Sequence, residues 1–185
     1  VVEAFEEEMN RGLELALENQ PTPYWIEGNI VDSQSTLTST TSGELLYQNR
    51  SESRRIRIDV RVGDEYFDNS NIDSFGYRGT VVTWLPLEDD SIALRRSIWL
   101  GIDRAYKDAI DTYAQKSAAW DSREYPERLE MLPIIDKTSI PNAPRLEELS
   151  DTWAQEFSSQ LSSVWKDYDN LEYNEVFVSE QQILE

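Results

Sequence analysis

The sequence predicts an α+β fold, in which a curved antiparallel sheet of about four to six strands packs against one long helix, with flanking N- and C-terminal helices. Alternating β-branched and charged residues between Arg54 and Val62 predict the clearest strand. Apolar residues at helical spacing from Ser91 to about Ala118 predict the long helix. Similar spacing over 2–19 and 146–168 predicts the flanking helices.

The central strand has one buried and one wet face. Four β-branched residues alternate with four charged ones: Ile56, Ile58, Val60 and Val62 with Arg55, Arg57, Asp59 and Arg61. A period of two places each set on its own side of a strand. Gly63 and Asp64 then break the run, and residues 65–68 can return antiparallel beside it.

The chain before the central strand predicts one helix and a meander of short strands. In the helix over 2–19, apolar Phe5, Met9, Leu13 and Leu17 recur at i+4, while Glu6, Glu7, Glu8, Glu14 and Glu18 are expected to face water. A strand over 24–31 is expected to turn at Asp32-Ser33. The Ser/Thr run 35–42 predicts an edge strand or a solvated face, and Ser42-Gly43-Glu44 predicts the next turn. The meander has about four or five short strands in all.

The long helix has a marked start. A short strand is predicted over 80–84, and Glu88, Asp89 and Asp90 then stand where the helix dipole favours negative charge. Either Asp90 or Ser91 can cap the helix. Its apolar stripe consists of Ile92, Ile98, Trp99, Ile102, Ala105, Tyr106, Ala109, Ile110 and Tyr113. At 1.5 Å per residue the helix is roughly 40 Å long and is expected to cover the apolar face of the sheet.

The rest of the chain completes one predicted domain of residues 1–185. Residues 1–122 form the sheet and long helix, and the proline-rich segment 123–145 forms an extended connection. Residues 146–185 form a helix followed by a strand over 171–178. The stripe of this last helix is Leu149, Trp153, Phe157, Leu161, Val164, Trp165 and Tyr168. We expect its tryptophans, like Trp99 and Trp120, to pack in the core rather than line a ligand pocket.

Charge and composition exclude several functional classes. The net charge of −19 repels nucleic acid and anionic lipid, so we expect no nucleic-acid partner and no membrane partner. The chain has neither Cys nor His, which excludes thiol chemistry, imidazole bases and Cys/His zinc sites within it. No apolar run approaches the roughly 20 residues that span a bilayer. Because the chain opens with Val1-Val2 and no apolar leader, we interpret it as a mature or partial form.

Five of the 17 basic residues lie close together and form the candidate binding site. They are Arg50, Arg54, Arg55, Arg57 and Arg61. On one interpretation they form a cationic face for a carboxylate, a phosphate or an acidic partner. On the other, which an acidic chain favours, they pair across strands with Glu27, Asp32, Glu44, Glu52, Asp59 and Glu65.

Other chemistry is weakly supported. The segment Asp68 to Asp73 has oxygen ligands that suit Ca²⁺, but Ile72 and Ser74 break the EF-hand pattern, so an Asn/Asp-rich turn is the preferred interpretation. With 36 acidic residues, no pair of carboxylates can be singled out for acid–base catalysis. No phosphate loop, dinucleotide fingerprint or nucleophile elbow is present. We therefore assign no catalytic residue and no metal ligand.

Several short motifs follow one another along the chain. The first motifs are Pro23-Tyr24-Trp25-Ile26-Glu27, Asp32-Ser33, Asn49-Arg50-Ser51-Glu52-Ser53-Arg54, Arg57-Ile58-Asp59-Val60-Arg61-Val62-Gly63-Asp64 and Asp68-Asn69-Ser70-Asn71. The later motifs are Leu85-Pro86-Leu87-Glu88-Asp89-Asp90, Ala93-Leu94-Arg95-Arg96, Trp99-Leu100 and Asp103-Arg104-Ala105-Tyr106-Lys107. In this order they resemble the N-terminal region of TldD/PmbA-like proteins, a family described as metallopeptidase-related and as "modulator of DNA gyrase". The similarity runs from about Phe5 to Lys116, with a looser echo over 146–178.

The resemblance implies a bacterial, oligomeric protein whose subunits enclose a chamber that receives unfolded peptide. It implies an α/β N-terminal domain followed by a larger β-rich domain, in which proteolytic members hold zinc through an H-E-x-x-x-H motif. This chain has no His to match that motif, so it needs no cofactor itself, and zinc is expected only in a C-terminal part of the parent protein. The resemblance favours the cytoplasm, while an exported form stays open.

The sequence therefore leads to one favoured function and two rivals. The favoured one is a non-catalytic N-terminal domain that serves subunit assembly and formation of the peptide chamber, with peptide adding to a sheet edge. The first rival is a standalone adaptor domain that binds an acidic partner through the arginine-rich strand. The second is an enzyme that works with carboxylates alone.

Overall fold

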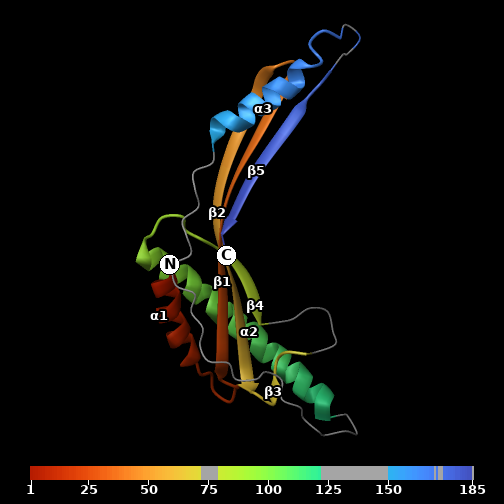
Figure 1. The fold of residues 1–185 in the computed structure, drawn as a ribbon. Coiled ribbons are helices and arrows are strands. Elements are labelled where there is room, and N and C mark those ends of the chain that lie inside the picture. Colours follow the sequence, from red (N-terminus) through yellow and green to blue (C-terminus); the bar gives the residue numbers. More distant parts are fainter. Residues whose placement is uncertain (72–78, 122–149, 169, 171–172, 185) are drawn as a thin grey trace. The chain divides into compact units, whose positions relative to one another are not determined.

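The α+β class is confirmed by a computed structural model, which describes residues 1–71, 79–121, 150–168, 170 and 173–184 (Figure 1). Its helices are α1 (Val2–Leu13), α2 (Ser91–Asp121) and α3 (Asp151–Ser163). Its strands are β1 (Pro23–Thr41), β2 (Glu44–Asp64), β3 (Phe67–Asp68), β4 (Thr80–Leu85) and β5 (Val176–Leu184). The strand order is β3-β2-β1-β5, with β4 also paired to β2.

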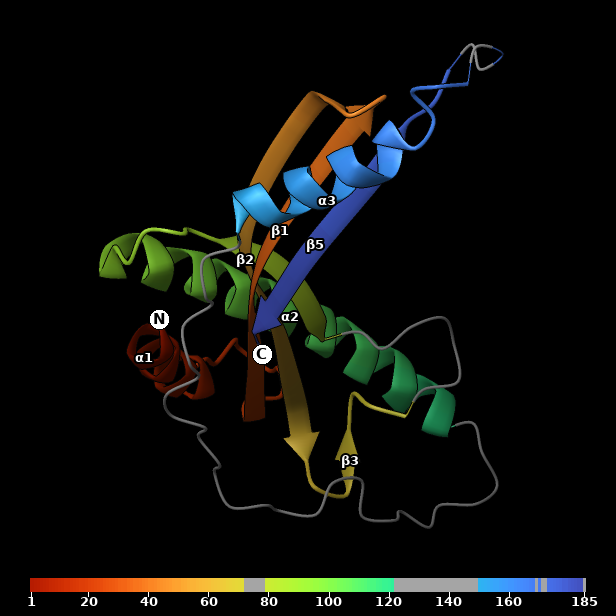
Figure 2. The same cartoon turned by 45° about the horizontal axis from the view of Figure 1, so that its top comes forward.

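The chain divides into two compact units. Unit 1 comprises Val1–Ile30 and Arg55–Asn142, and unit 2 comprises Val31–Arg54 and Ala143–Glu185. Because β1 and β2 are long, each contributes one part to unit 1 and the other to unit 2. Figure 2 shows the same elements from a second direction. The proline-rich connection predicted over 123–145 lies outside the described residues.

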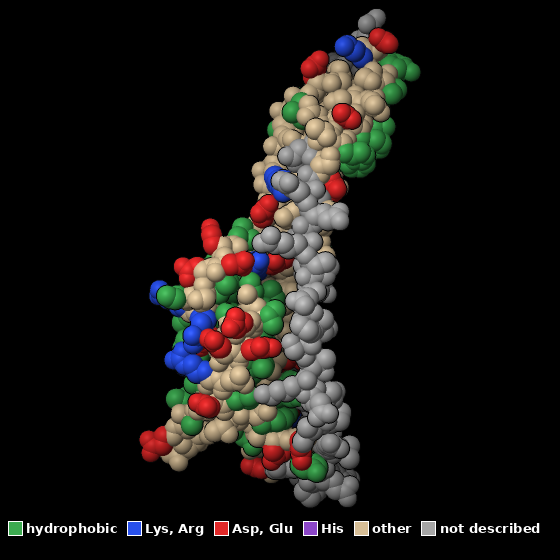
Figure 3. Space-filling model, turned by 60° about the vertical axis from the view of Figure 1, so that its left-hand side comes forward, with side chains coloured by type: hydrophobic (Ala, Val, Ile, Leu, Met, Phe, Trp, Pro, Cys, Tyr) green, Lys and Arg blue, Asp and Glu red, His purple; other side chains and the backbone are tan. Residues whose placement is uncertain are grey.

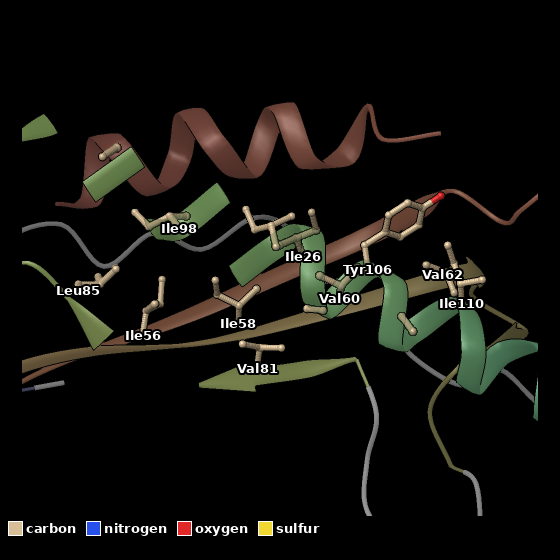
Figure 4. Close-up of a cluster of buried hydrophobic side chains, with 14 of the residues drawn as sticks. Ile26, Ile56, Ile58, Val60, Val62, Val81, Leu85, Ile98, Tyr106 and Ile110 are labelled. Carbon is tan, nitrogen blue, oxygen red and sulfur yellow. The ribbon is translucent and has the colours of Figure 1, made fainter. Parts of the chain in front are cut away.

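The core of unit 1 forms around the β-branched face of β2. Ile56, Ile58, Val60 and Val62 are fully buried, as the alternation predicted, and each buried side chain of this size contributes roughly 1.5–3 kcal/mol. Apolar residues of α2 complete the cluster: Leu94, Ile98, Ile102, Ala105, Tyr106, Ala109 and Ile110 (Figure 4). The prediction that the long helix covers this face is confirmed. Ile92 was predicted in the same stripe, but it is 79% exposed in the first turn of α2.

Helix α1 is shorter than the predicted helix over 2–19. It ends at Leu13, where the amides of Glu14 and Leu15 bond to the carbonyls three residues back and tighten the last turn. The expectation that Glu8 faces water is also wrong. Its carboxylate is buried because Arg95 of α2 donates from Nε at 2.7 Å and Arg11 donates from Nη1 at 3.2 Å. An ion pair therefore fastens α1 to α2.

The predicted meander of short strands is replaced by two long strands. No turn forms at Asp32-Ser33, because Asp32 accepts two hydrogen bonds from Arg54, at 2.7 and 2.9 Å, and the Ser33 hydroxyl bonds to that of Ser53 at 2.7 Å. These cross-strand bonds keep β1 extended. The Ser/Thr run is neither an edge nor a solvated face, since β1 lies between β2 and β5 and the run is largely buried.

The predicted turns and caps are largely confirmed. Ser42 and Gly43 both have positive φ, at 46° and 85°, which is the geometry of a tight hairpin turn between β1 and β2. The return strand after Gly63 exists as the two-residue β3, and the predicted strand over 80–84 is β4. Asp90 caps α2, because its Oδ1 accepts from the amides of Ile92 and Ala93.

The C-terminal elements differ in extent from the predicted ones. Helix α3 ends at Ser163 rather than Tyr168, and Ser150 caps its start by accepting from the Trp153 amide. The strand predicted over 171–178 is β5, which pairs antiparallel with β1 in a register that places Thr38 opposite Val178. Strand β5 therefore extends to Leu184, six residues beyond the predicted end.

Candidate functional site

Of the five predicted arginines, Arg50 and Arg54 lie in unit 2, and both make ion pairs. Arg54 holds Asp32 in the two-point geometry typical of a guanidinium and a carboxylate. Arg50 lies 3.3 Å from the carboxylate of Glu52. Here the arginines behave as the cross-strand pairing interpretation expects, although Arg50 pairs with a residue of its own strand.

Of the five predicted arginines, the three that lie in unit 1 comprise two exposed side chains and one engaged side chain. Arg55 and Arg57 are exposed, and neither makes an ion pair within the described part of the chain. Arg61 is only 19% exposed and donates to Asp68 at 3.2 Å and to the Ser70 hydroxyl at 3.3 Å. The structure thus places the five predicted site residues in different surroundings and leaves Arg55 and Arg57 as the accessible cations.

Arg61 leads to a polar cluster centred on Asp68, which lies at the end of β3 in unit 1. The Asp68 carboxylate is fully buried. Its Oδ2 accepts from the Tyr24 hydroxyl at 2.7 Å and from Arg61, and its Oδ1 accepts from the amide and hydroxyl of Ser70, at 2.8 and 2.5 Å. Four donor groups therefore surround one carboxylate, which we call the Asp68 cluster.

Lys116 of α2 also contacts the Asp68 cluster. Its ammonium group is nearly buried and donates to the backbone carbonyls of Asp68, at 2.9 Å, and Ser70, at 2.6 Å. It also lies 3.9 Å from Asp68 Oδ1 and 4.9 Å from the centre of the Phe67 ring. The neighbouring Asn69 bonds to the backbone of β2, with its Oδ1 accepting from the Val62 amide at 2.9 Å. The segment 68–70 is thus held by side-chain bonds to β2 and α2.

The surroundings of Asp68 favour its charged form. Burial by itself raises the pKa of this carboxyl, but hydrogen bonds from Ser70 and Tyr24 and the nearby Arg61 charge outweigh burial and lower the pKa. The pKa of the Tyr24 hydroxyl is raised, first by its burial and then by its hydrogen bond to the Asp68 carboxylate. The cluster therefore holds an anionic Asp68 and a neutral tyrosine.

This arrangement does not suit acid–base or metal chemistry. A carboxylate with a lowered pKa and four donors has little tendency to take up a proton, and a tyrosine with a raised pKa stays protonated and so cannot accept one. Two cations already compensate Asp68, so the first oxygen of the Ca²⁺ motif considered above is occupied; Ile72 and Asp73 of that motif lie outside the described residues. Over the described ranges, no group of three or more Asp, Glu, Cys or His side chains could hold a metal ion. The Asp68 cluster is therefore structural.

Sequence reasoning missed the role of Lys116, although one signal pointed to it. Lys116 follows Ala109 and Tyr113 at helical spacing, so it falls on the apolar stripe of α2, where a cation requires a buried partner. The partner could not be found from sequence, because Asp68 is 48 residues earlier in the chain. No local pattern distinguishes Asp68 from the other acidic residues.

Within the described part of the chain, two surfaces of unit 2 are not covered by other residues. The first is the outer edge of β5, the end strand of the sheet order, which within the described ranges pairs only with β1. The second is a row of large apolar side chains on α3 and the turn after it, each at least 40% exposed: Trp153, Phe157, Leu161, Val164, Trp165 and Tyr168. The expectation that the tryptophans of this helix pack in a core is wrong. These two surfaces and the exposed Arg55 and Arg57, rather than the Asp68 cluster, are the candidates for binding.

Replacing Asp68 tests the structural role of its cluster. Asp68→Asn keeps the side-chain size but leaves Arg61 and Lys116 beside a neutral amide. We therefore expect the free energy of unfolding, measured by urea denaturation, to fall by about 3–5 kcal/mol. Asp103→Asn is the matched control, because the Asp103–Lys107 pair is exposed and contributes about 0.5 kcal/mol. Equal losses in the two variants would contradict the assignment.

The Asp68 cluster also predicts a pH dependence. Because the pKa of Asp68 in the folded chain is below its ordinary value of 3.8, the unfolded chain binds more protons near that pH. The stabilisation is complete above about pH 5 and decreases as pH falls through 3.8 towards the folded pKa. The stability difference between wild type and Asp68→Asn should therefore shrink between about pH 5 and about pH 3. A difference that stays constant over this range would rule out the lowered pKa.

Comparisons with known proteins do not identify a family for this chain. No protein-family model matches the chain, and a search of curated proteins finds no match. No helix among the described residues is long and apolar enough to cross a membrane. The function is therefore argued from the surfaces of the chain and from the motifs given above.

Proposed function

We propose that this chain is the non-catalytic N-terminal domain of a TldD/PmbA-like, metallopeptidase-related protein, and that it serves subunit assembly and formation of a peptide-receiving chamber. The ordered motifs between Phe5 and Lys116 support this family, and the α+β fold is compatible with it. Zinc, where the parent protein has it, would be held outside this chain, because the chain has no His.

The open edge of β5 is the observation that carries the proposal. An exposed strand edge offers a row of backbone donors and acceptors to another extended chain, and proteins usually protect such edges with Pro, Lys or short strands. The segment Val176–Leu184 is nine residues long and contains neither Pro nor Lys. It is therefore suited to adding one further strand, from an unfolded peptide or from a neighbouring subunit.

Hydrogen exchange tests peptide addition at β5. We expect an extended peptide of about ten residues to slow amide exchange within residues 176–184, because new backbone hydrogen bonds form there. The matched control is the same peptide with every backbone amide N-methylated, which removes the donors from both of its edges and should give no protection. Protection by both peptides, or protection at α1 instead of β5, would contradict strand addition.

A standalone adaptor is the second candidate function, and the exposure of Arg55 and Arg57 favours it. These two side chains point from the wet face of β2 and make no ion pair within the described ranges, so they can bind carboxylates of an acidic partner. We expect Arg55→Glu with Arg57→Glu to weaken binding of a polyglutamate peptide by about tenfold or more if this function holds. Arg104→Glu, at an exposed site of α2, is the control. Equal binding by all three proteins would reject the adaptor.

A further inference from the structure

We propose that the exposed apolar row on α3 binds an amphipathic helix of a partner protein whose flanking residues are Lys and Arg. This row, which we call the α3 stripe, consists of Trp153, Phe157, Leu161, Val164, Trp165 and Tyr168. It is separate from the β5 edge, and its occupant would be a helix rather than an extended strand.

The described residues of unit 2 leave the α3 stripe largely exposed. Helix α3 lies along the sheet of this unit and buries Ala154, Ser158 and Ser162, while the Gly43 amide donates to the Ser162 hydroxyl at 2.9 Å (Figure 1). These three residues follow i, i+4 and i+8 spacing, so they form one line along the helix. The side that faces the sheet therefore consists of small, mostly polar residues.

This orientation reverses the usual arrangement of an amphipathic helix. Surface helices normally turn their large apolar side chains toward the core. The buried residues Thr36, Thr38 and Thr40 of β1 in the same unit are polar too, and within the described residues the hydroxyls of Thr36 and Thr40 have no hydrogen-bond partner. The large apolar side chains thus remain available to a partner.

The α3 stripe has the geometry of a helix-binding ridge. Trp153, Phe157, Leu161 and Trp165 recur every four residues, which is the spacing that packs into the groove of a second helix. Trp153 and Phe157 already stack, with ring centres 5.4 Å apart and planes 5° apart, so this part of the surface is ordered before binding. Tryptophan and tyrosine are the residue types that most often dominate binding energy at interfaces.

The exposed apolar area of the α3 stripe is larger than that of scattered apolar residues on an ordinary protein surface. Six large side chains, each roughly half exposed, present on the order of 500 Å² of apolar surface. Contiguous patches of several hundred Å² on soluble proteins mark interaction sites. In Figure 3, hydrophobic side chains gather at the surface of this part of the chain. With a polar rim added, the patch approaches the ~800 Å² that one partner contributes to a stable interface.

Charge selects the class of partner. From Asp151 to Glu185 the sequence has eight acidic residues and one basic residue, Lys166, and the described Glu156 and Asp167 are exposed on α3 and the turn after it. A partner helix with Lys and Arg beside its apolar face would be attracted, and one with Asp and Glu would be repelled. A second copy of this chain is disfavoured, because it carries the same net charge of −19. Anionic lipid is disfavoured for the same reason.

Two designed peptides test the proposal directly. Both are helical, of about 18 residues, with the same Leu and Phe face; one has Lys at the flanking positions and the other has Glu. We expect fluorescence anisotropy to show binding of the Lys peptide by the full chain, at least about tenfold weaker binding of the Glu peptide, and a further loss as salt is raised. This comparison uses the unaltered protein, so it does not depend on the folding of a variant.

Variants then locate the site. Phe157→Gln and Trp153→Gln should each weaken binding of the Lys peptide by about tenfold or more, as expected for exposed interface aromatics. The matched control is Trp84→Gln, because Trp84 is an aromatic of β4 that is 67% exposed but lies in unit 1. Circular dichroism melting of each variant shows whether it folds.

Four results would overturn the proposal. They are equal affinity for the Lys and Glu peptides, no binding of the Lys peptide at about 100 µM, an equal loss in Trp84→Gln, and concentration-dependent dimerisation that Phe157→Gln abolishes. The last would assign the stripe to a second copy of the chain. Because the N-methylated peptide reports on β5 alone, failure of strand addition and failure of the α3 stripe are distinguishable.

Discussion

Burial of the β-branched face of β2 under α2 is the interaction on which unit 1 depends. Ile58 and its neighbours at every second position have no contact with solvent, and α2 closes over them for most of its length. The arrangement fixes which face of β2 is wet, and it therefore fixes the outward position of Arg55 and Arg57. The same burial makes the interior around Asp68 dry, so this carboxylate needs a full set of donors.

Within the described residues of unit 1, the buried carboxylates of Glu8 and Asp68 are both paired with cations of the same unit. Glu8 is compensated by Arg95 and Arg11, and Asp68 by Arg61 and Lys116. A catalytic carboxyl generally needs a neighbour that shifts its pKa towards neutrality. The pKa of Asp68 is shifted in the opposite direction. These charges hold segments together instead, which is compatible with a structural or binding role.

Unit 2 stabilises itself in a different way and leaves surface for partners. Helix α3 buries the small side chains Ala154, Ser158 and Ser162, and cross-strand hydroxyl pairs such as Ser35 with Ser51, at 2.8 Å, join β1 and β2. Such contacts are individually weak, since a typical hydrogen bond contributes about 0.5–1.5 kcal/mol. Its largest apolar side chains are on the α3 stripe, where they bury little surface in the unit itself. Contact with a partner would add the apolar burial that unit 2 lacks.

The sequence by itself determined the elements that a local pattern specifies. The period-two run of β2, the long helix with its Asp90 cap and the Ser42-Gly43 turn follow from spacing and backbone preference, which involve only near neighbours. It also indicated the resemblance that underlies the proposed function. Of the five arginines proposed from sequence, Arg55 and Arg57 keep the exposed position that a binding face requires.

Only the tertiary structure decided which partners distant residues find. Asp32 lies in the middle of a strand because Arg54 and the neighbouring serine pair hold it there, against its own turn preference. Lys116 and Asp68 meet because α2 crosses the end of β3, and no local pattern encodes that contact. The sequence also could not predict the orientation of α3. Its periodicity shows one stripe of large apolar residues, but the helix buries the small residues on the adjacent side, which pack closely. That choice of side leaves the α3 stripe exposed.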